Sequence, residues 1–86
     1  MYRLATLPRA EKHFAKLPQK TQQKIFIALS KLANNPFNRE LNIKKMVASK
    51  QSYRLRVGEL RVIYEMDTKS KAIFILDIDF RRTTTY

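Results

Sequence analysis

The chain has 86 residues, too few for two separate hydrophobic cores, so we expect a single domain over residues 1–86. It carries 18 Lys and Arg against 7 Asp and Glu, and this net charge of +11 makes nucleic acid the first candidate partner, ahead of an acidic protein or an anionic membrane. The absence of Cys and the single His exclude disulfides, thiolate zinc sites, Cys nucleophiles and multi-His metal centres, so we expect no metal and no cofactor.

A membrane location is the weakest of these alternatives. Residues 1–10 lack the apolar segment of a signal peptide, and no apolar run approaches the roughly 18 residues that a membrane-spanning helix needs. The absence of Cys suits the reducing cytosol. We therefore expect a cytoplasmic protein that does not bind membranes.

The first half of the chain predicts a strand followed by two helices. Residues 2–6 have the pattern of a short strand, and Pro8 suits the first turn of a helix. An apolar stripe at helical spacing follows, made of Leu7, Ala10, Phe14 and Leu17. Pro18 opens a second helix, which ends at residues 34–36. Its stripe consists of Ile25, Ala28, Leu29 and Leu32. The short connection predicts an antiparallel helical hairpin.

The second half changes to the period of strands. After an irregular basic stretch, three segments alternate between apolar and polar residues: 53–57, 60–66 and 72–80. Gly58-Glu59 between the first two favours a type II′ hairpin turn. The predicted fold class is therefore α+β, with the order β-α-α-β-β-β and an antiparallel sheet on which the N-terminal helical hairpin packs on one face.

The predicted hairpin places arginines together on the polar face of the sheet. Arg56 lies opposite Arg61 in this register, and Arg54 shares their face. Two like charges directly opposite each other on adjacent strands destabilise a sheet, so we expect that these arginines are kept because they bind a ligand. A phosphate would be such a ligand, because guanidinium forks match its oxygens.

The last segment continues this face. We expect Asp77, Asp79 and Arg81 on it, with Tyr86 just beyond. Arginines together with an aromatic ring can hold a phosphate and stack on a base. The alternative is a solvated face on which the two aspartates pair with the arginines, followed by a frayed terminal tyrosine. His13, on the flank of the first helix, is interpreted as a surface or packing residue.

Residues 52–65, with the sequence SYRLRVGELRVIYE, are similar to the most recognisable stretch of the RelE/ParE toxin superfamily. The opening resembles it too, with Arg9-Ala10 and residues 14–17, and the arrangement covers the whole chain. The resemblance implies a microbial type II toxin that is encoded with an antitoxin and neutralised by it. RelE-like members cut mRNA on the ribosome without a metal, by attack of the ribose 2′-OH on the adjacent phosphate. ParE-like members poison DNA gyrase.

The resemblance to RelE-like members also implies which residues are catalytic. In those members basic residues stand at the places of Arg54 and Arg56, arginines at those of Arg61 and Arg81, and a tyrosine at that of Tyr86. We expect these five residues to be catalytic. Further basic residues are expected to bind RNA: Lys44, Lys45, Lys50 and Arg82.

Three functions stay open at this point. The first is a ribosome-dependent mRNA endonuclease, which inhibits translation and arrests growth, and the full set of five residues favours it. The second is a ParE-like gyrase inhibitor without nuclease activity, and the third is a nucleic-acid-binding domain or toxin relic that only represses its operon. Phe80 stands where RelE-like members often carry His or Lys, and it favours the second and third functions. Arginine holds its proton in proteins, so Arg54 and Arg56 leave the general base of the endonuclease unassigned. The expected partners are an acidic cognate antitoxin, mRNA and the ribosome, and operator DNA only through the antitoxin.

Overall fold

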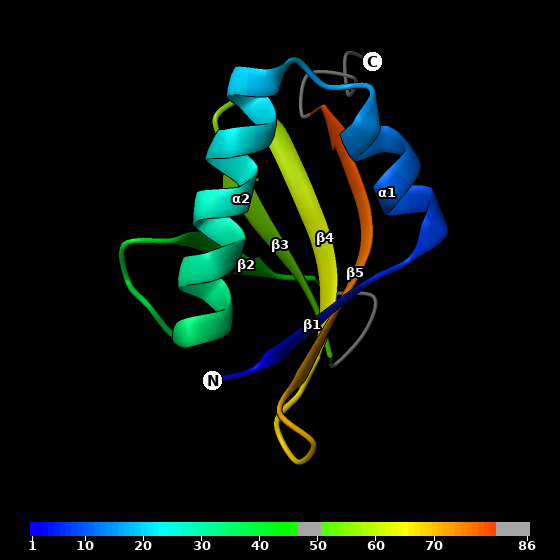
Figure 1. The fold of residues 1–86 in the computed structure, drawn as a ribbon. Coiled ribbons are helices and arrows are strands. Elements are labelled where there is room, and N and C mark those ends of the chain that lie inside the picture. Colours follow the sequence, from blue (N-terminus) through cyan, green and yellow to red (C-terminus); the bar gives the residue numbers. More distant parts are fainter. Residues whose placement is uncertain (47–50, 81–86) are drawn as a thin grey trace.

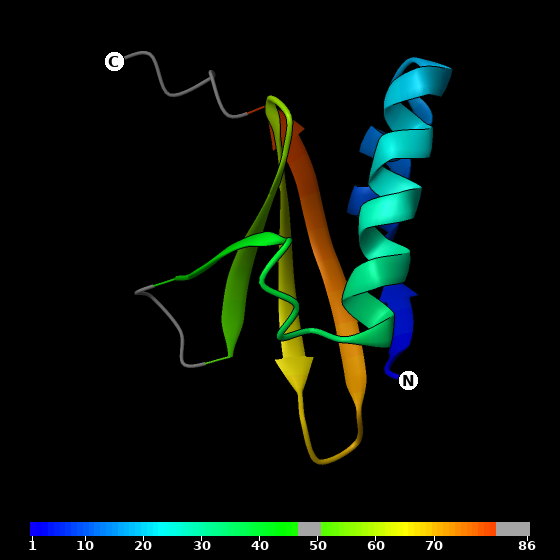
Figure 2. The ribbon, with the colours of Figure 1, turned by 90° about the vertical axis from the view of Figure 1, so that its left-hand side faces the viewer.

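The computed structural model describes residues 1–46 and 51–80, in which two helices cover one face of a five-stranded sheet (Figure 1). The elements follow one another as β1 (Arg3–Thr6), α1 (Pro8–Ala15), α2 (Gln19–Asn34), β2 (Asn42–Lys45), β3 (Ser52–Val57), β4 (Leu60–Asp67) and β5 (Ala72–Phe80). The strand order across the sheet is β1-β5-β4-β3-β2. Figure 2 shows both helices on the same side of the sheet.

This arrangement confirms the expected α+β fold, with two differences in the sheet. β1 runs parallel to β5, so the sheet is mixed rather than wholly antiparallel. β1 lies beside the last strand, and the hairpin with β4 fixes the direction of that strand. In addition, the basic stretch that was expected to be irregular contains a strand, β2, which pairs with β3. Its sequence contains a single apolar residue, Ile43, and so has no alternation to detect.

The prolines of the N-terminal half lie where the helices begin. Pro8 is the first residue of α1, and Pro18 directly precedes α2, positions at which no intrahelical N–H is needed. α2 ends at Asn34, because Asn35 takes an extended backbone with φ −152°. Both predicted helices are thus confirmed, and Figure 1 shows them running in opposite directions.

The core lies between the helices and the sheet. Its largest fully buried side chains come from α2 and the three central strands: Tyr64, Ile25, Leu32, Leu55, Ile73, Ile75 and Val62. Tyr53 lies opposite Tyr64, and the two rings stack with centroids 5.6 Å apart. Every second residue of β3 and β4 therefore points away from the helices.

The β3–β4 hairpin has the predicted register. Gly58 and Glu59 form its loop, and Arg56 lies opposite Arg61. Gly58 has φ +60°, whereas Glu59 is not among the described residues with positive φ, as a type II′ turn requires. No atom of residues 1–46 or 51–80 would lie within 4 Å of a Cβ at position 58, so the backbone conformation favours glycine there.

A β-bulge changes which face of β5 its residues occupy. Ile63 pairs with Asp77 and Tyr64 pairs with Ile75, so Leu76 is an extra residue in β5. Ile75 is buried before the bulge and Ile78 after it, although strict alternation from Ile75 would turn position 78 outward. The bulge thus keeps three isoleucines of β5 in the core, the third being Ile73, and brings Asp79 opposite Arg61.

Candidate functional site

Four cations lie on the sheet face turned away from the helices, and we call them the cationic face: Lys44, Arg54, Arg56 and Arg61. Lys44 lies opposite Arg54, and Arg56 lies opposite Arg61. Each pair brings two like charges together across adjacent strands, an arrangement that destabilises a sheet. The structure therefore brings together three of the predicted catalytic residues and one predicted RNA-binding lysine.

Lys45 does not belong to this face. It lies opposite Tyr53, on the side of the sheet that carries the helices, and its side chain is exposed. Alternation along β2 separates it from its neighbour Lys44. Lys45 therefore lies on the opposite side of the sheet from Lys44, with which it was predicted to bind RNA.

Arg61 is the cation of this face that has a carboxylate partner in the described residues. Its Nε donates a hydrogen bond of 3.1 Å to Oδ1 of Asp79, which lies directly opposite on β5. The side chain of Arg61 is only 19% exposed, whereas Arg56 is exposed and its Nε lies 3.4 Å from the Gly58 carbonyl oxygen. Arg61 is thus the more fixed of the two opposed arginines.

Asp77 does not pair with the arginines of the cationic face, contrary to one of the two alternatives from the sequence. Its Oδ1 accepts hydrogen bonds from Nδ1 of His13, at 2.7 Å, and from the N–H of Ile78, at 2.8 Å. Its Oδ2 lies 3.4 Å from Nε of Arg9. Nδ1 of His13 also lies 3.1 Å from the Ile78 carbonyl oxygen, and because both neighbours are acceptors, this nitrogen carries a proton. His13 therefore ties α1 to β5, which fits its expected packing role.

Four predicted site residues lie outside the described residues: Lys50, Arg81, Arg82 and Tyr86. Phe80, the last described position of β5, pairs with Leu60.

The cationic face can hold phosphates and stabilise negative charge. Arginine keeps its proton in proteins, so Arg54, Arg56 and Arg61 supply hydrogen-bond donors but no general base. Within residues 1–46 and 51–80, no group of three or more His, Asp or Glu could hold a metal ion. Among the described residues, the two groups with clearly shifted pKa lie elsewhere: burial raises the pKa of Tyr64 in the core, and a hydrogen bond with Ser70 lowers the pKa of Asp67 at the end of β4.

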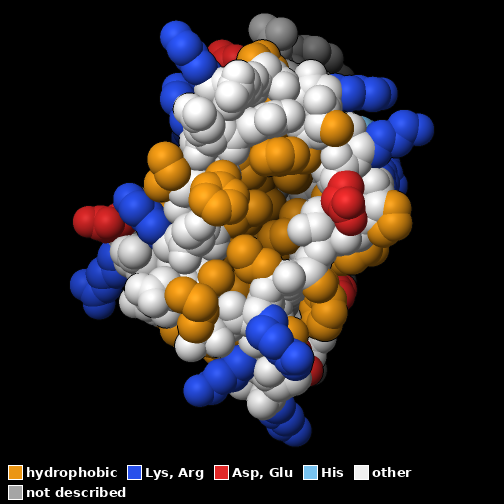
Figure 3. Space-filling view, in the orientation of Figure 1, with side chains coloured by type: hydrophobic (Ala, Val, Ile, Leu, Met, Phe, Trp, Pro, Cys, Tyr) orange, Lys and Arg blue, Asp and Glu red, His pale blue; other side chains and the backbone are white. Residues whose placement is uncertain are grey.

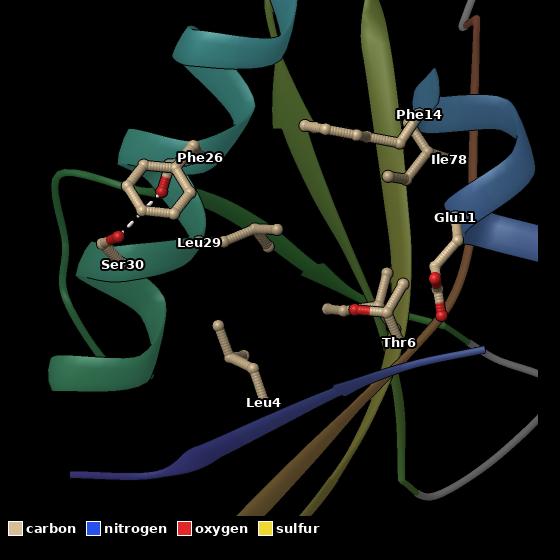
Figure 4. A pocket seen from close by; sticks show the side chains of 9 residues that line it. Leu4, Thr6, Glu11, Phe14, Phe26, Leu29, Ser30 and Ile78 are labelled. Atoms are coloured by element: carbon tan, nitrogen blue, oxygen red, sulfur yellow. Dashed lines mark hydrogen bonds between the residues drawn. The ribbon is translucent and has the colours of Figure 1, made fainter. Parts of the chain in front are cut away.

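A second feature, an apolar groove, lies on the helix-bearing side of the sheet. α1 packs on β5 and α2 contacts β3, and between them is a hollow of about 360 Å³ (Figure 3). Its apolar lining consists of Leu4, Phe14, Phe26, Leu29, Ile75 and Ile78. In Figure 4, Leu29 of α2, Phe14 of α1 and Leu4 of β1 point toward the space between the two helices. Among the described residues that line it, Glu11 is the charged one.

Sequence reasoning did not identify this groove, although the chain carries a signal for it. Phe26, which lines the groove, is an apolar residue outside the stripe of the second helix and is 68% exposed, and its neighbour Ile27, which does not line the groove, is 55% exposed. Large apolar side chains that are gathered on a surface mark interaction sites. The groove is therefore a candidate docking surface.

Comparisons with known proteins agree with this architecture. The sequence model of the ParE toxin of type II toxin–antitoxin systems matches residues 4–84. A chain of the archaeal RelE–RelB complex from Pyrococcus horikoshii OT3 is similar at 26% identity, with a TM-score of 0.82 over 93% of this chain and 94% of that chain. The E. coli RelBE toxin–antitoxin complex gives 20% identity and a TM-score of 0.77 over 93% and 96%. A chain of the RelBE2 toxin–antitoxin complex of Mycobacterium tuberculosis is similar at 22% identity, with a TM-score of 0.75 over 93% of this chain and 98% of that chain. No curated protein sequence matches the chain.

The fold is that of the RelE toxins, and the family match spans nearly the whole chain. The chain belongs to the ParE toxin family, within the RelE/ParE superfamily that its strand motif resembles, and is a toxin of a type II toxin–antitoxin system. No helix in the described part of the chain is long and apolar enough to cross a membrane.

Proposed function

We propose that the chain is a cytoplasmic, ribosome-dependent mRNA endonuclease, which inhibits translation until a cognate antitoxin neutralises it. The observation that carries the proposal is the cationic face, where two like-charge pairs lie across adjacent strands and a single carboxylate offsets them in the described residues. A stable fold with a thin margin does not keep such pairs without a ligand that relieves them. An RNA phosphate relieves them, since each arginine offers several N–H donors to its oxygens.

The reaction would be transesterification within the RNA. The ribose 2′-oxygen forms a bond to the adjacent phosphorus and loses its proton, while the bond from phosphorus to the 5′-oxygen breaks and that oxygen gains a proton. The products are a 2′,3′-cyclic phosphate and a free 5′-hydroxyl. Arg61, with Arg54 and Arg56, would stabilise the charge that develops on the equatorial phosphate oxygens. By the family resemblance, Arg81 and Tyr86 would complete the site.

The antitoxin would cover the apolar groove with an apolar helix and the cationic face with an acidic segment. The net charge of +11 supports an acidic partner, and the exposed Phe26 and Ile27 support an apolar contact. The Pyrococcus horikoshii relative is described as a RelE–RelB complex, which supports the same kind of partner. Contact with operator DNA would come only through this antitoxin.

Cleavage of mRNA on purified ribosomes tests the endonuclease. The wild-type chain should cut ribosome-bound mRNA, and Arg61→Ala should lower the rate by roughly 10²-fold, the scale of losing one preorganised donor. Thermal unfolding of the same samples separates lost chemistry from lost folding. Cleavage by Arg61→Ala at the wild-type rate would contradict the assigned site.

Inhibition of DNA gyrase is the second candidate function. The matching family is that of the ParE toxins, and Phe80 stands where RelE-like members often carry His or Lys. A supercoiling assay with purified gyrase tests it. Growth arrest and gyrase inhibition without any mRNA cleavage would establish this candidate in place of the endonuclease.

A further inference from the structure

Asp79 distinguishes Arg61 from the other cations of the cationic face. The Nε–Oδ1 hydrogen bond of 3.1 Å joins two partly buried side chains, 19% and 33% exposed. The ion pairs of the described residues give no carboxylate partner to Lys44, Arg54 or Arg56. Among these four cations, Arg61 is therefore held by a carboxylate of the described residues, and Arg61 is the residue that the proposed chemistry needs as a fixed donor.

The bulge at Leu76 creates this contact. Without the extra residue, pairing from Tyr64 and Ile75 would place Ile78 opposite Arg61 and turn Asp79 toward the core. With it, Ile78 is buried and Asp79 lies opposite Arg61. Bulges commonly re-aim side chains next to functional sites.

The contact leaves the phosphate-binding edge of the guanidinium free. Arginine has five N–H donors, of which the Asp79 hydrogen bond uses the one on Nε. The two terminal nitrogens of Arg61 have no hydrogen-bond partner among the described residues. We propose that Asp79 is a positioning residue, which fixes Arg61 through Nε so that its terminal nitrogens meet the phosphate in the transition state. This inference rests on the proposed endonuclease function.

Removal of the Asp79 carboxylate has two opposite effects, one through the charge of the face and one through the position of Arg61. The Asp79 carboxylate lowers the positive potential of the face, so its removal strengthens the general attraction for RNA. Its removal also frees Arg61 to take other orientations, and a misplaced donor slows the chemical step. The effect on kcat therefore separates from the effect on KM.

Ribosome-dependent mRNA cleavage by Asp79→Ala and Asp79→Asn tests the assignment. Asp79→Ala should lower kcat on the order of tenfold without raising KM. Asp79→Asn keeps an oxygen acceptor for Nε without the charge, so it should recover most of kcat, whereas a pure charge effect would treat both variants alike. In an Arg61→Ala background, Asp79→Ala should cause no further loss.

Glu65→Gln is the matched control. Glu65 points to the same side of the sheet as Arg61 and lies opposite Ser52 and Phe74, so its neutralisation removes one charge without touching Arg61. If Asp79→Ala unfolds, Asp79→Val takes its place in the test, because valine favours strands and also lacks an oxygen acceptor. Wild-type kcat in Asp79→Ala, or equal losses in the alanine and asparagine variants, would overturn the positioning role alone. Absence of cleavage by the wild type would overturn the proposed function and this inference together.

Discussion

Arg56 and Arg61 lie directly opposite each other across the β3–β4 hairpin, yet only Arg61 has a carboxylate partner in the described residues. The two arginines thus share a face but differ in what holds them. Replacement of either one relieves the same repulsion. Only the replacement of Arg61 also leaves a partly buried Asp79 without its cation.

Arg56→Ala is expected to raise stability and weaken RNA binding. The variant relieves a cross-strand like-charge pair, worth roughly 0.2–1 kcal/mol, and loses no ion pair found in the described residues. Thermal and urea unfolding at low salt measure the gain, which should shrink as salt screens the repulsion. Arg61→Ala serves as the comparison and should gain less, because Asp79 then lacks its partner. A destabilised Arg56→Ala would show that Arg56 has a structural role.

Lys44→Ala is expected to weaken binding to single-stranded RNA, whereas Lys45→Ala is expected to have little effect. The two lysines are neighbours on one strand, but they point to opposite sides of the sheet. Loss of one phosphate contact should make the slope of log K against log salt less negative by about 0.7. Fluorescence anisotropy titrations from low to moderate salt measure both slopes. Equal losses in the two variants would mean that RNA binding follows net charge rather than the cationic face.

The register of the β3–β4 hairpin was predictable because it depends on local sequence alone. A lone glycine between two alternating segments sets both the turn and the facing residues, including the opposed Arg56 and Arg61. The helices were predictable for the same reason, since Pro8, Pro18 and the apolar stripes are local signals.

Features that depend on tertiary contacts were not predictable from the sequence. The bulge at Leu76 appears only when β5 must bury Ile75 and Ile78 against the same core. The alternative in which both aspartates pair with the arginines of this face holds for Asp79 only, because Asp77 contacts His13 and Arg9 of α1. The apolar groove arises from the spacing of two helices over a sheet, which no local pattern encodes; the sequence signals only that Phe26 lies outside the buried stripe of α2.

Stability is expected to fall at high pH because of Tyr64. Burial raises the pKa of this phenol in the folded state above its unfolded value of roughly 10. A raised folded pKa contributes stability that is complete below the unfolded pKa and is lost as the pH rises above it. Chemical unfolding at pH 8 and at pH 10.5 to 11, values chosen to bracket roughly 10, measures the loss. Tyr64→Phe should lose less stability over this interval, and an identical loss in the two proteins would assign it to other groups.

Phe26→Ala is expected to weaken antitoxin binding while leaving the toxin itself stable. Phe26 lines the apolar groove and is 68% exposed, so its truncation removes little core packing but much of a docking surface. Phe37 is the matched control, because it is 67% exposed and does not line this groove. Affinity for the protein encoded by the adjacent gene, measured by calorimetry, should fall at least tenfold for Phe26→Ala and stay near wild type for Phe37→Ala.

The sheet separates this groove from the cationic face, so the same variant also tests how the toxin is silenced. Phe26→Ala should bind RNA like the wild type, since Lys44, Arg54, Arg56 and Arg61 lie on the other side of the sheet. In cells that express the antitoxin, weaker capture of an intact toxin should then restore growth arrest. Equal antitoxin affinity for the Phe26 and Phe37 variants would show that the groove is not the docking surface. A loss of RNA binding in Phe26→Ala would show that the two faces are coupled through the sheet.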